Sequence, residues 1–192
     1  MEETFNNKTI ILASKSPRRQ QLLTDLGIKF SVKTKEVDEI YPEHLRKQEV
    51  ALYLAELKAK AFDEELTEDI IVITADTIVC VDNLIIGKPI DKLDAERILN
   101  LLSGRKHEVI TGVCLHNSKK LKSFYVTTGV YFKKLSEKEI DYYLENYKPY
   151  DKAGAYGIQE WIGLIGVEKI EGSFYNVMGL PVKEVFEELL AF

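Results

Sequence analysis

The apolar residues of this chain follow two periods, one typical of buried strands and one typical of amphipathic helices. A β-branched, apolar run over residues 69–81 (DIIVITADTIVCV) predicts a central strand covered on both faces. Val50 and Leu54 share one face of the segment 42–66, which predicts a long amphipathic helix. Because helices and strands alternate along the chain, we expect an α/β fold with a mixed, twisted sheet flanked by helices.

Shorter segments predict the remaining elements. Strands are expected at 9–14, 28–34, 108–116 and 121–132, of which the last two form a hairpin. Helices are expected at 17–26, 91–102, 136–147 and from Pro181 onward, and short strands within 149–178.

The chain carries no internal repeat and no low-complexity segment. We therefore predict a single domain over residues 1–192. If the chain were divided into two lobes, the pattern would place the boundary near Ser103 or Lys134.

Composition narrows the class of protein. The 192 residues are 45% hydrophobic and 30% charged, which is the balance of a globular protein with a real core. Lysine and arginine total 26 against 31 aspartates and glutamates, so the net charge is −5. A general binder of nucleic-acid polymers relies on a basic excess, and that class is disfavoured, although a local basic pocket remains compatible with this charge.

The cysteines and the termini exclude several further classes. Cys80 and Cys114 lie far apart in no CxxC pair, and the three histidines form no ligand pattern, so neither zinc nor a disulfide framework is expected. Residues 1–8 are acidic and polar, unlike a secretory signal. The longest apolar stretch, 70–86, is interrupted by Asp76 and is no membrane span. We expect a cytoplasmic protein.

The segment 14–19 (SKSPRR) is a candidate anion site where a strand turns into a helix. Ser16 suits the N-cap and Pro17 the first helical position, which leaves backbone amides unpaired at the helix start. Arg18 and Arg19 lie in the first turn, where the helix dipole disfavours each cation by roughly 0.3–1 kcal/mol. A phosphate chain would offset this cost. The alternative is a pair of solvated arginines on a surface helix.

Asp76 and Lys58 are the next candidates. Aspartate is depleted in strands, so Asp76 within an apolar run must be paired, bound to a metal or placed at the end of the sheet. We favour a general base or a cation ligand over a structural aspartate that caps a loop. Lys58 shares the apolar arc of its helix with Leu54, which indicates a side chain that extends to solvent, or to phosphates if they lie nearby.

Three loops hold weaker candidates. Glu36 in EVDE suits a divalent cation on a polyphosphate, or a solvated loop. Lys88 in Gly-Lys-Pro suits a phosphate, or an ordinary turn. Gln159 ends the glycine-rich AGAYGIQ, where its amide offers a nucleobase edge both a donor and an acceptor, unless this is only a tight loop.

Taken together and in order, these segments resemble the Maf nucleotide pyrophosphatases. The resemblance implies a mixed α/β fold akin to that of inosine triphosphatases, in a cytoplasmic enzyme that is often a homodimer. It also implies hydrolysis of nucleoside triphosphates to the monophosphate and pyrophosphate with a divalent cation, Mg²⁺ or Mn²⁺. The segments that carry it are SKSPRR, EVDE, LKAKA, TADT, GKP, TGV, DKAGAYGIQ and GSFYNVMGLPV.

The resemblance also assigns roles to single residues. Asp76 matches the family's catalytic base, and Arg18, Thr77 and Gln159 match positions that select the substrate. The other polar pocket residues it implies are Ser14, Arg19, Glu36, Lys58 and Lys88, with Glu36 and Asp76 toward the metal. Two segments resemble those of the branch of the family that acts on dTTP and UTP: SPRR, which carries no inserted tryptophan, and AGAYGIQ. Glu160 departs from the pattern, because a glycine often follows the glutamine.

The resulting hypothesis is that Arg18, Arg19, Lys58 and Lys88 hold a triphosphate while Asp76 activates a water at the α-phosphorus. Two alternatives stand beside it. One is a nucleotide-binding regulator of septum formation without turnover, and the other is a house-cleaning pyrophosphatase directed at purines.

Overall fold

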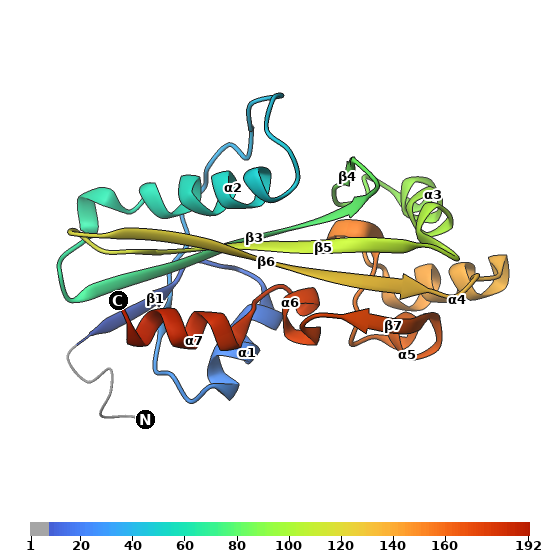
Figure 1. Ribbon diagram of the computed structural model, residues 1–192. Helices are drawn as coiled ribbons and strands as arrows, with labels where there is room; N and C mark the ends of the chain where they lie inside the picture. Colours follow the sequence, from blue (N-terminus) through green and yellow to red (C-terminus); the bar gives the residue numbers. More distant parts are fainter. Residues whose placement is uncertain (1–7) are drawn as a thin grey trace. The chain divides into compact units, whose positions relative to one another are not determined.

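A computed structural model describes residues 8–192, so the acidic segment 1–7 lies outside the described residues. Seven strands form one sheet in the order β2-β1-β3-β5-β6-β7, with β4 paired to β3 (Figure 1). The β1 pairings with β2 and β3 are parallel, whereas β4 and β7 pair antiparallel with β3 and β6. The sheet is mixed and flanked by helices, which confirms the predicted fold class.

The strands are β1 (Thr9–Leu12), β2 (Ser31–Val32), β3 (Ile70–Val81), β4 (Leu84–Ile86), β5 (Lys106–His116), β6 (Leu121–Phe132) and β7 (Val167–Glu171). The α-helices are α1 (Pro17–Asp25), α2 (Gln48–Lys60), α3 (Lys92–Leu102), α4 (Glu137–Tyr147), α5 (Trp161–Gly166), α6 (Phe174–Met178) and α7 (Val182–Leu190). Short 3-10 turns cover Asp63–Glu65 and Ala153–Ala155. In the described part of the chain, no helix is long and apolar enough to cross a membrane.

Three predicted elements are wrong in extent or type. The helix predicted at 42–66 covers only α2, because Lys47 has a positive φ of 37° that prevents an earlier helical start. The strand predicted at 28–34 shrinks to the two residues of β2, which pair with Ile11 and Leu12 of β1. The segment 149–178 forms mainly the short helices α5 and α6 and one strand, β7.

The chain divides into two compact units. The first consists of Met1–Asp76, Thr111–Val126 and Gly179–Phe192, and the second of Thr77–Ile110 and Thr127–Met178. Three of the four crossing points fall inside the long strands β3, β5 and β6. The boundaries therefore differ from the positions suggested near Ser103 and Lys134, because periodicity cannot reveal a break inside a continuous strand. The single domain over 1–192 stays a prediction.

In the first unit, α2 covers one face of the sheet, while α1 and α7 lie on the other (Figure 1). Gly112 in β5 permits a close approach, since a Cβ there would lie 2.4 Å from the carbonyl oxygen of Ala51 in α2. The buried hydroxyl of Thr74 in β3 donates to the carbonyl of Ala55 at 2.6 Å. These two contacts fix α2 on the sheet and thereby set the position of Lys58, one turn further along.

The second unit has its own apolar core, built from the end of β3, β4, α3, β5, β6, α4 and α5. Within it, the rings of His107, Phe132 and Tyr156 pack edge to face at centroid distances of 4.9–5.4 Å. The His107 Nε2 atom lies 2.7 Å from the Tyr156 hydroxyl. Burial disfavours the charged imidazole and lowers the pKa of His107 to about 4.

The low pKa of His107 predicts that the protein loses stability in weak acid. The unfolded chain takes up a proton on this imidazole near pH 6.5, whereas the folded chain does so only near pH 4. Its contribution is therefore complete above pH 6.5 and is lost as the pH falls toward 4, by about 3 kcal/mol in total. Urea unfolding between pH 7 and pH 4.5 measures it.

The matched comparison replaces a buried and an exposed histidine. His107→Phe should flatten the pH dependence of the unfolding free energy, whereas His44→Gln, at an exposed position, should leave it as in the wild type. A His107→Phe protein with the wild-type slope would contradict the assignment.

Candidate active site

The loop between β1 and α1 is organised by a buried serine. Ser14 is 7% exposed, and its Oγ accepts a hydrogen bond from the backbone N–H of Ser16 at 3.2 Å. Ser16 occupies the N-cap position and Pro17 the start of α1, as predicted, but the Ser16 side chain makes no capping hydrogen bond. Ser14 thus uses its hydroxyl to shape the loop. Arg18 follows in the first turn and is half-buried.

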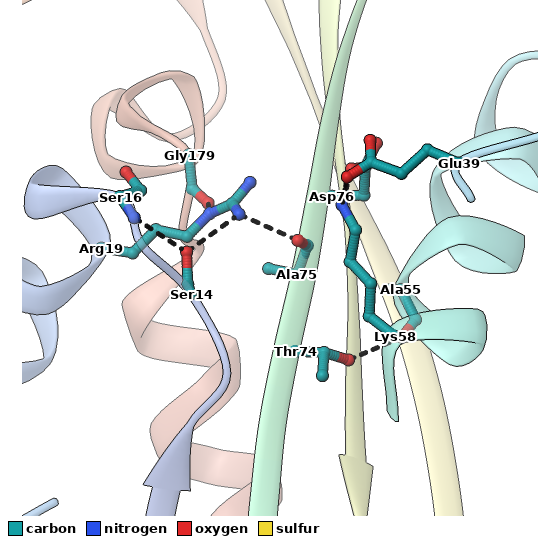
Figure 2. Close-up of polar contacts among 10 residues, drawn as sticks. All are labelled: Ser14, Ser16, Arg19, Glu39, Ala55, Lys58, Thr74, Ala75, Asp76 and Gly179. Atoms are coloured by element: carbon teal, nitrogen blue, oxygen red, sulfur yellow. Dashed lines mark hydrogen bonds and ion pairs between the residues drawn. The ribbon is translucent and has the colours of Figure 1, made fainter. Parts of the chain in front are cut away.

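Arg19 binds backbone carbonyls rather than standing free on the helix. Its Nε donates to the Gly179 carbonyl at 2.7 Å, and its Nη1 to the Ala75 carbonyl at 2.9 Å and to the Ser14 Oγ at 3.4 Å. The guanidinium therefore joins α1 to β3 and to the segment before α7 (Figure 2). The interpretation of Arg18 and Arg19 as a pair of solvated arginines is wrong for Arg19.

Burial and nearby charges act on Arg19 in opposite directions. Desolvation lowers the pKa of its guanidinium, while the carboxylates of Asp76 and Glu39 raise it. Arginine nevertheless remains charged at any physiological pH. Asp76 thus lies in the field of a fixed cation on the α1 side of β3.

On the α2 side of β3, two carboxylates meet at one ammonium (Figure 2). The Lys58 Nζ atom lies 2.5 Å from the Asp76 Oδ1 and 3.0 Å from the Glu39 Oε1. The side chains of Lys58 and Asp76 are only 17% and 12% exposed, whereas that of Glu39 is 49% exposed. The expectation that Asp76 must be paired is confirmed, and Lys58 ends at carboxylates rather than in bulk solvent.

The structure brings Glu39 to this cluster, and not Glu36. Glu36 is almost fully exposed and faces Lys15 at 3.9 Å, a surface pair of little energetic weight. Glu39 follows three residues later in the same acidic segment, EVDEI. Sequence reasoning missed it because the segment has no periodicity from which the direction of each side chain could be deduced.

The remaining predicted residues belong to the second unit. Thr77 directly follows Asp76 in β3 and is half-buried. Lys88 is exposed in the loop after β4, and this loop is held by the Gly154 N–H, which donates to the Gly87 carbonyl at 3.1 Å. Gln159 is exposed at the end of the glycine-rich segment that contains Gly154. The backbone bond therefore joins the Lys88 loop to the segment that carries Gln159.

The donor set suits a hard divalent cation. Between residues 8 and 192, no group of three or more histidine, cysteine or acidic side chains is placed to hold a metal by itself. The Lys58 ammonium, however, stands between the oxygens of Asp76 and Glu39, where two carboxylates already share one positive charge. Carboxylate oxygens with the remaining places filled by phosphates and water are typical of Mg²⁺ sites on nucleotides.

The comparison with protein families shows the family to which the chain belongs. The model of the family described as Maf-like protein matches residues 9–192. The chain belongs to the Maf family. Among curated relatives, a protein of Phocaeicola vulgatus named "dTTP/UTP pyrophosphatase" is 52% identical over 190 residues, covering 98% of both chains. One of Parabacteroides distasonis with the same name is 50% identical over the full length of both.

A solved structure shows the same fold at low sequence identity. A HAM1 protein from Coxiella burnetii aligns with this Maf chain at a TM-score of 0.52 and 16% identity, covering 96% of this chain and all of the other. At that identity the likeness concerns the fold alone, and it agrees with the mixed sheet described above.

The Lys58–Asp76 pair should show strong energetic coupling. We expect a double-mutant cycle of Lys58→Met and Asp76→Asn to give a coupling energy of about 1–3 kcal/mol, because Lys58→Met leaves the Asp76 carboxylate buried without its ammonium, while Asp76→Asn leaves Lys58 with Glu39 alone. The exposed pair Lys92–Glu145, at 3.5 Å, is the matched control and should give about 0–1 kcal/mol. Urea unfolding of the variants measures both, and equal coupling in the two cycles would contradict the assignment.

Proposed function

We propose that this Maf protein hydrolyses nucleoside triphosphates, with dTTP and UTP as preferred substrates, to the monophosphate and pyrophosphate. The observation that carries the proposal is the buried carboxylate of Asp76, held by Lys58 beside Glu39 in a chain about 50% identical to proteins named dTTP/UTP pyrophosphatase. A buried carboxylate next to two further charged groups is costly for stability, and such arrangements are typical of catalytic sites.

In the proposed reaction a water attacks the α-phosphorus of the triphosphate. The bond from this phosphorus to the oxygen that bridges to the β-phosphate breaks, and pyrophosphate leaves. Asp76 accepts the proton of the attacking water. No covalent intermediate with the enzyme is needed, so positioning and charge neutralisation supply most of the rate.

Lys58 has two tasks in this scheme. In the free protein its ammonium neutralises Asp76 and Glu39. With substrate bound, we propose that it binds a phosphate oxygen, together with Arg18. Arg19, whose guanidinium is bound to three oxygens of the protein, holds Ser14 and the Ala75 carbonyl in place; we propose that its share in phosphate binding is smaller than that of Arg18.

The oxygens of Asp76 and Glu39 are the groups that would hold a divalent cation, most simply Mg²⁺, with Mn²⁺ as an alternative. When bound, the cation would neutralise the phosphate oxygens and favour the departure of pyrophosphate. Glu36 remains a predicted ligand. Glu39 is the stronger candidate, because it lies at the Lys58 ammonium beside Asp76, whereas Glu36 is exposed and faces Lys15 at 3.9 Å.

Substrate selection is proposed for three residues on the basis of the family pattern. Arg18 and Thr77 would contact the nucleotide, and the Gln159 amide would read the edge of the base. Lys88, exposed beside the Gln159 segment, would bind phosphate. A cytoplasmic location and a homodimer accompany the proposal, and light scattering of the purified chain tests the latter.

Loss of the Asp76 carboxylate should abolish most turnover. We expect Asp76→Asn to lower kcat for dTTP by roughly 10²–10⁴-fold, because the amide cannot accept the proton. Asp141→Asn, an exposed change on α4, is the control and should keep the wild-type kcat. Pyrophosphate release from dTTP, UTP, CTP and GTP, with and without magnesium, provides the measurement.

The same assay separates the alternatives. Near-native kcat in a folded Asp76→Asn protein would exclude Asp76 as the general base. Partial rescue of the variant by excess magnesium would identify Asp76 as a metal ligand. A larger loss for Glu39→Gln than for Glu36→Gln is expected. Tight nucleotide binding without release from any substrate would favour a regulator, and higher kcat/KM for modified purine triphosphates would favour a purine-directed enzyme.

A further inference from the structure

The exposed Gln159 lies in a hydrogen-bonded turn. The Glu160 N–H donates to the Gly157 carbonyl at 3.0 Å, which makes Ile158 and Gln159 the two central residues of the turn. Within residues 8–192 the Gln159 side chain makes no hydrogen bond, so nothing on its own side chain orients the amide. The turn therefore fixes the backbone position from which this side chain extends.

One buried hydroxyl holds both ends of this turn. The Tyr143 oxygen accepts from the Gly157 N–H at 3.0 Å, and the same hydroxyl donates to the Glu160 Oε2. Tyr143 is fully buried in α4, and burial together with the neighbouring Glu160 carboxylate raises the pKa of its phenol. The hydroxyl thus stays protonated and joins the first and last residues of the turn to a core helix.

The second carboxylate oxygen of Glu160 is bound as well. The Lys152 Nζ atom lies 3.2 Å from the Glu160 Oε1 and 2.7 Å from the Asp151 Oδ1, and the Lys152 side chain is 10% exposed. The Glu160 side chain folds back over Gly157, where a Cβ would lie 2.7 Å from the Glu160 Cδ. A side chain at position 157 would displace the Glu160 carboxylate from the place where it meets Tyr143 and Lys152.

We propose that Glu160, held by Tyr143 and Lys152, is a positioning residue: it fixes the backbone at Gln159, limits where the amide can meet the base, and thereby sets the preference for the base. The inference rests on the proposed function. Glu160 stands where the family pattern often has glycine, and in this chain its carboxylate is held by a hydroxyl and an ion pair.

Rigidity of this turn matters because an amide can read two opposite patterns. Uracil and thymine present a ring N–H donor beside an acceptor oxygen, whereas cytosine presents an acceptor nitrogen beside an amino donor. A glutamine amide that rotates by half a turn exchanges its own donor and acceptor and matches either base. Selection between them therefore requires a fixed backbone position for Gln159, from which the amide meets the base in one orientation and not in the other.

The test compares UTP with CTP, which differ only in the base. We expect Tyr143→Phe to lower the ratio of kcat/KM for UTP over CTP by about tenfold, the scale of the net contribution of one hydrogen bond. The control is Tyr131→Phe, which removes a hydroxyl that donates to the Glu171 carboxylate at 2.6 Å on the exposed side of β6, and should leave the ratio unchanged. The ratio does not depend on the fraction of folded enzyme, so a destabilised variant still gives an answer.

A double-mutant cycle shows whether the effect passes through Gln159. In a Gln159→Ala background, Tyr143→Phe should not change the ratio further. An unchanged ratio in Tyr143→Phe alone, or an equal fall with and without Gln159, would overturn the proposal. Glu160→Gln, which can still accept from Tyr143 but loses the charge that binds Lys152, should give a smaller fall than Tyr143→Phe.

A second measurement needs no turnover. Hydrogen exchange of the Gly157 amide should be faster in Tyr143→Phe than in the wild type and unchanged in Tyr131→Phe. Equal exchange rates in all three proteins would overturn the proposal that the Tyr143 hydroxyl holds the turn. If the wild type releases no pyrophosphate, the proposed function fails; the ratio of dissociation constants for UTP and CTP in the same variants then tests the positioning role, with the same expected fall.

Discussion

The buried charge of Asp76 is the constraint on which the first unit depends. A carboxylate in an apolar strand is tolerated only with a partner, and Lys58 supplies one at 2.5 Å. Lys58 reaches it because the Thr74 hydroxyl and the bare backbone at Gly112 hold α2 against β3 and β5. The family segments that contain Thr74 and Gly112 therefore serve the charged pair, although neither residue touches it.

The second unit solves a different problem with similar means. It holds the turn that carries the exposed Gln159, and it does so with a buried tyrosine, a buried lysine and a carboxylate. In both units the exposed or reactive group is small, and most of the polar structure lies behind it. The residues that hold the site thus outnumber those proposed to touch the substrate.

The fold class followed from the sequence because periodicity is a local signal. The long strand β3 and the helix α2 could be predicted from the spacing of apolar residues alone, apart from the late start of α2 that Lys47 imposes. Asp76 and Lys58 stood out for the same reason, as charged residues on apolar faces. The partners of Arg19 could not be deduced, because the carbonyls that it binds lie 56 and 160 residues away in sequence. Glu39 could not be distinguished from Glu36, since the aperiodic chain between them decides which one turns inward.

The bond pattern at Tyr143 has a direction. A backbone N–H can only donate and a carboxylate can only accept. The Tyr143 hydroxyl therefore accepts from the Gly157 N–H and directs its own proton at the Glu160 carboxylate. Because one partner can only donate and the other can only accept, the hydroxyl cannot reverse its orientation. The turn is thus polarised in one sense, and each bond in the series strengthens the next.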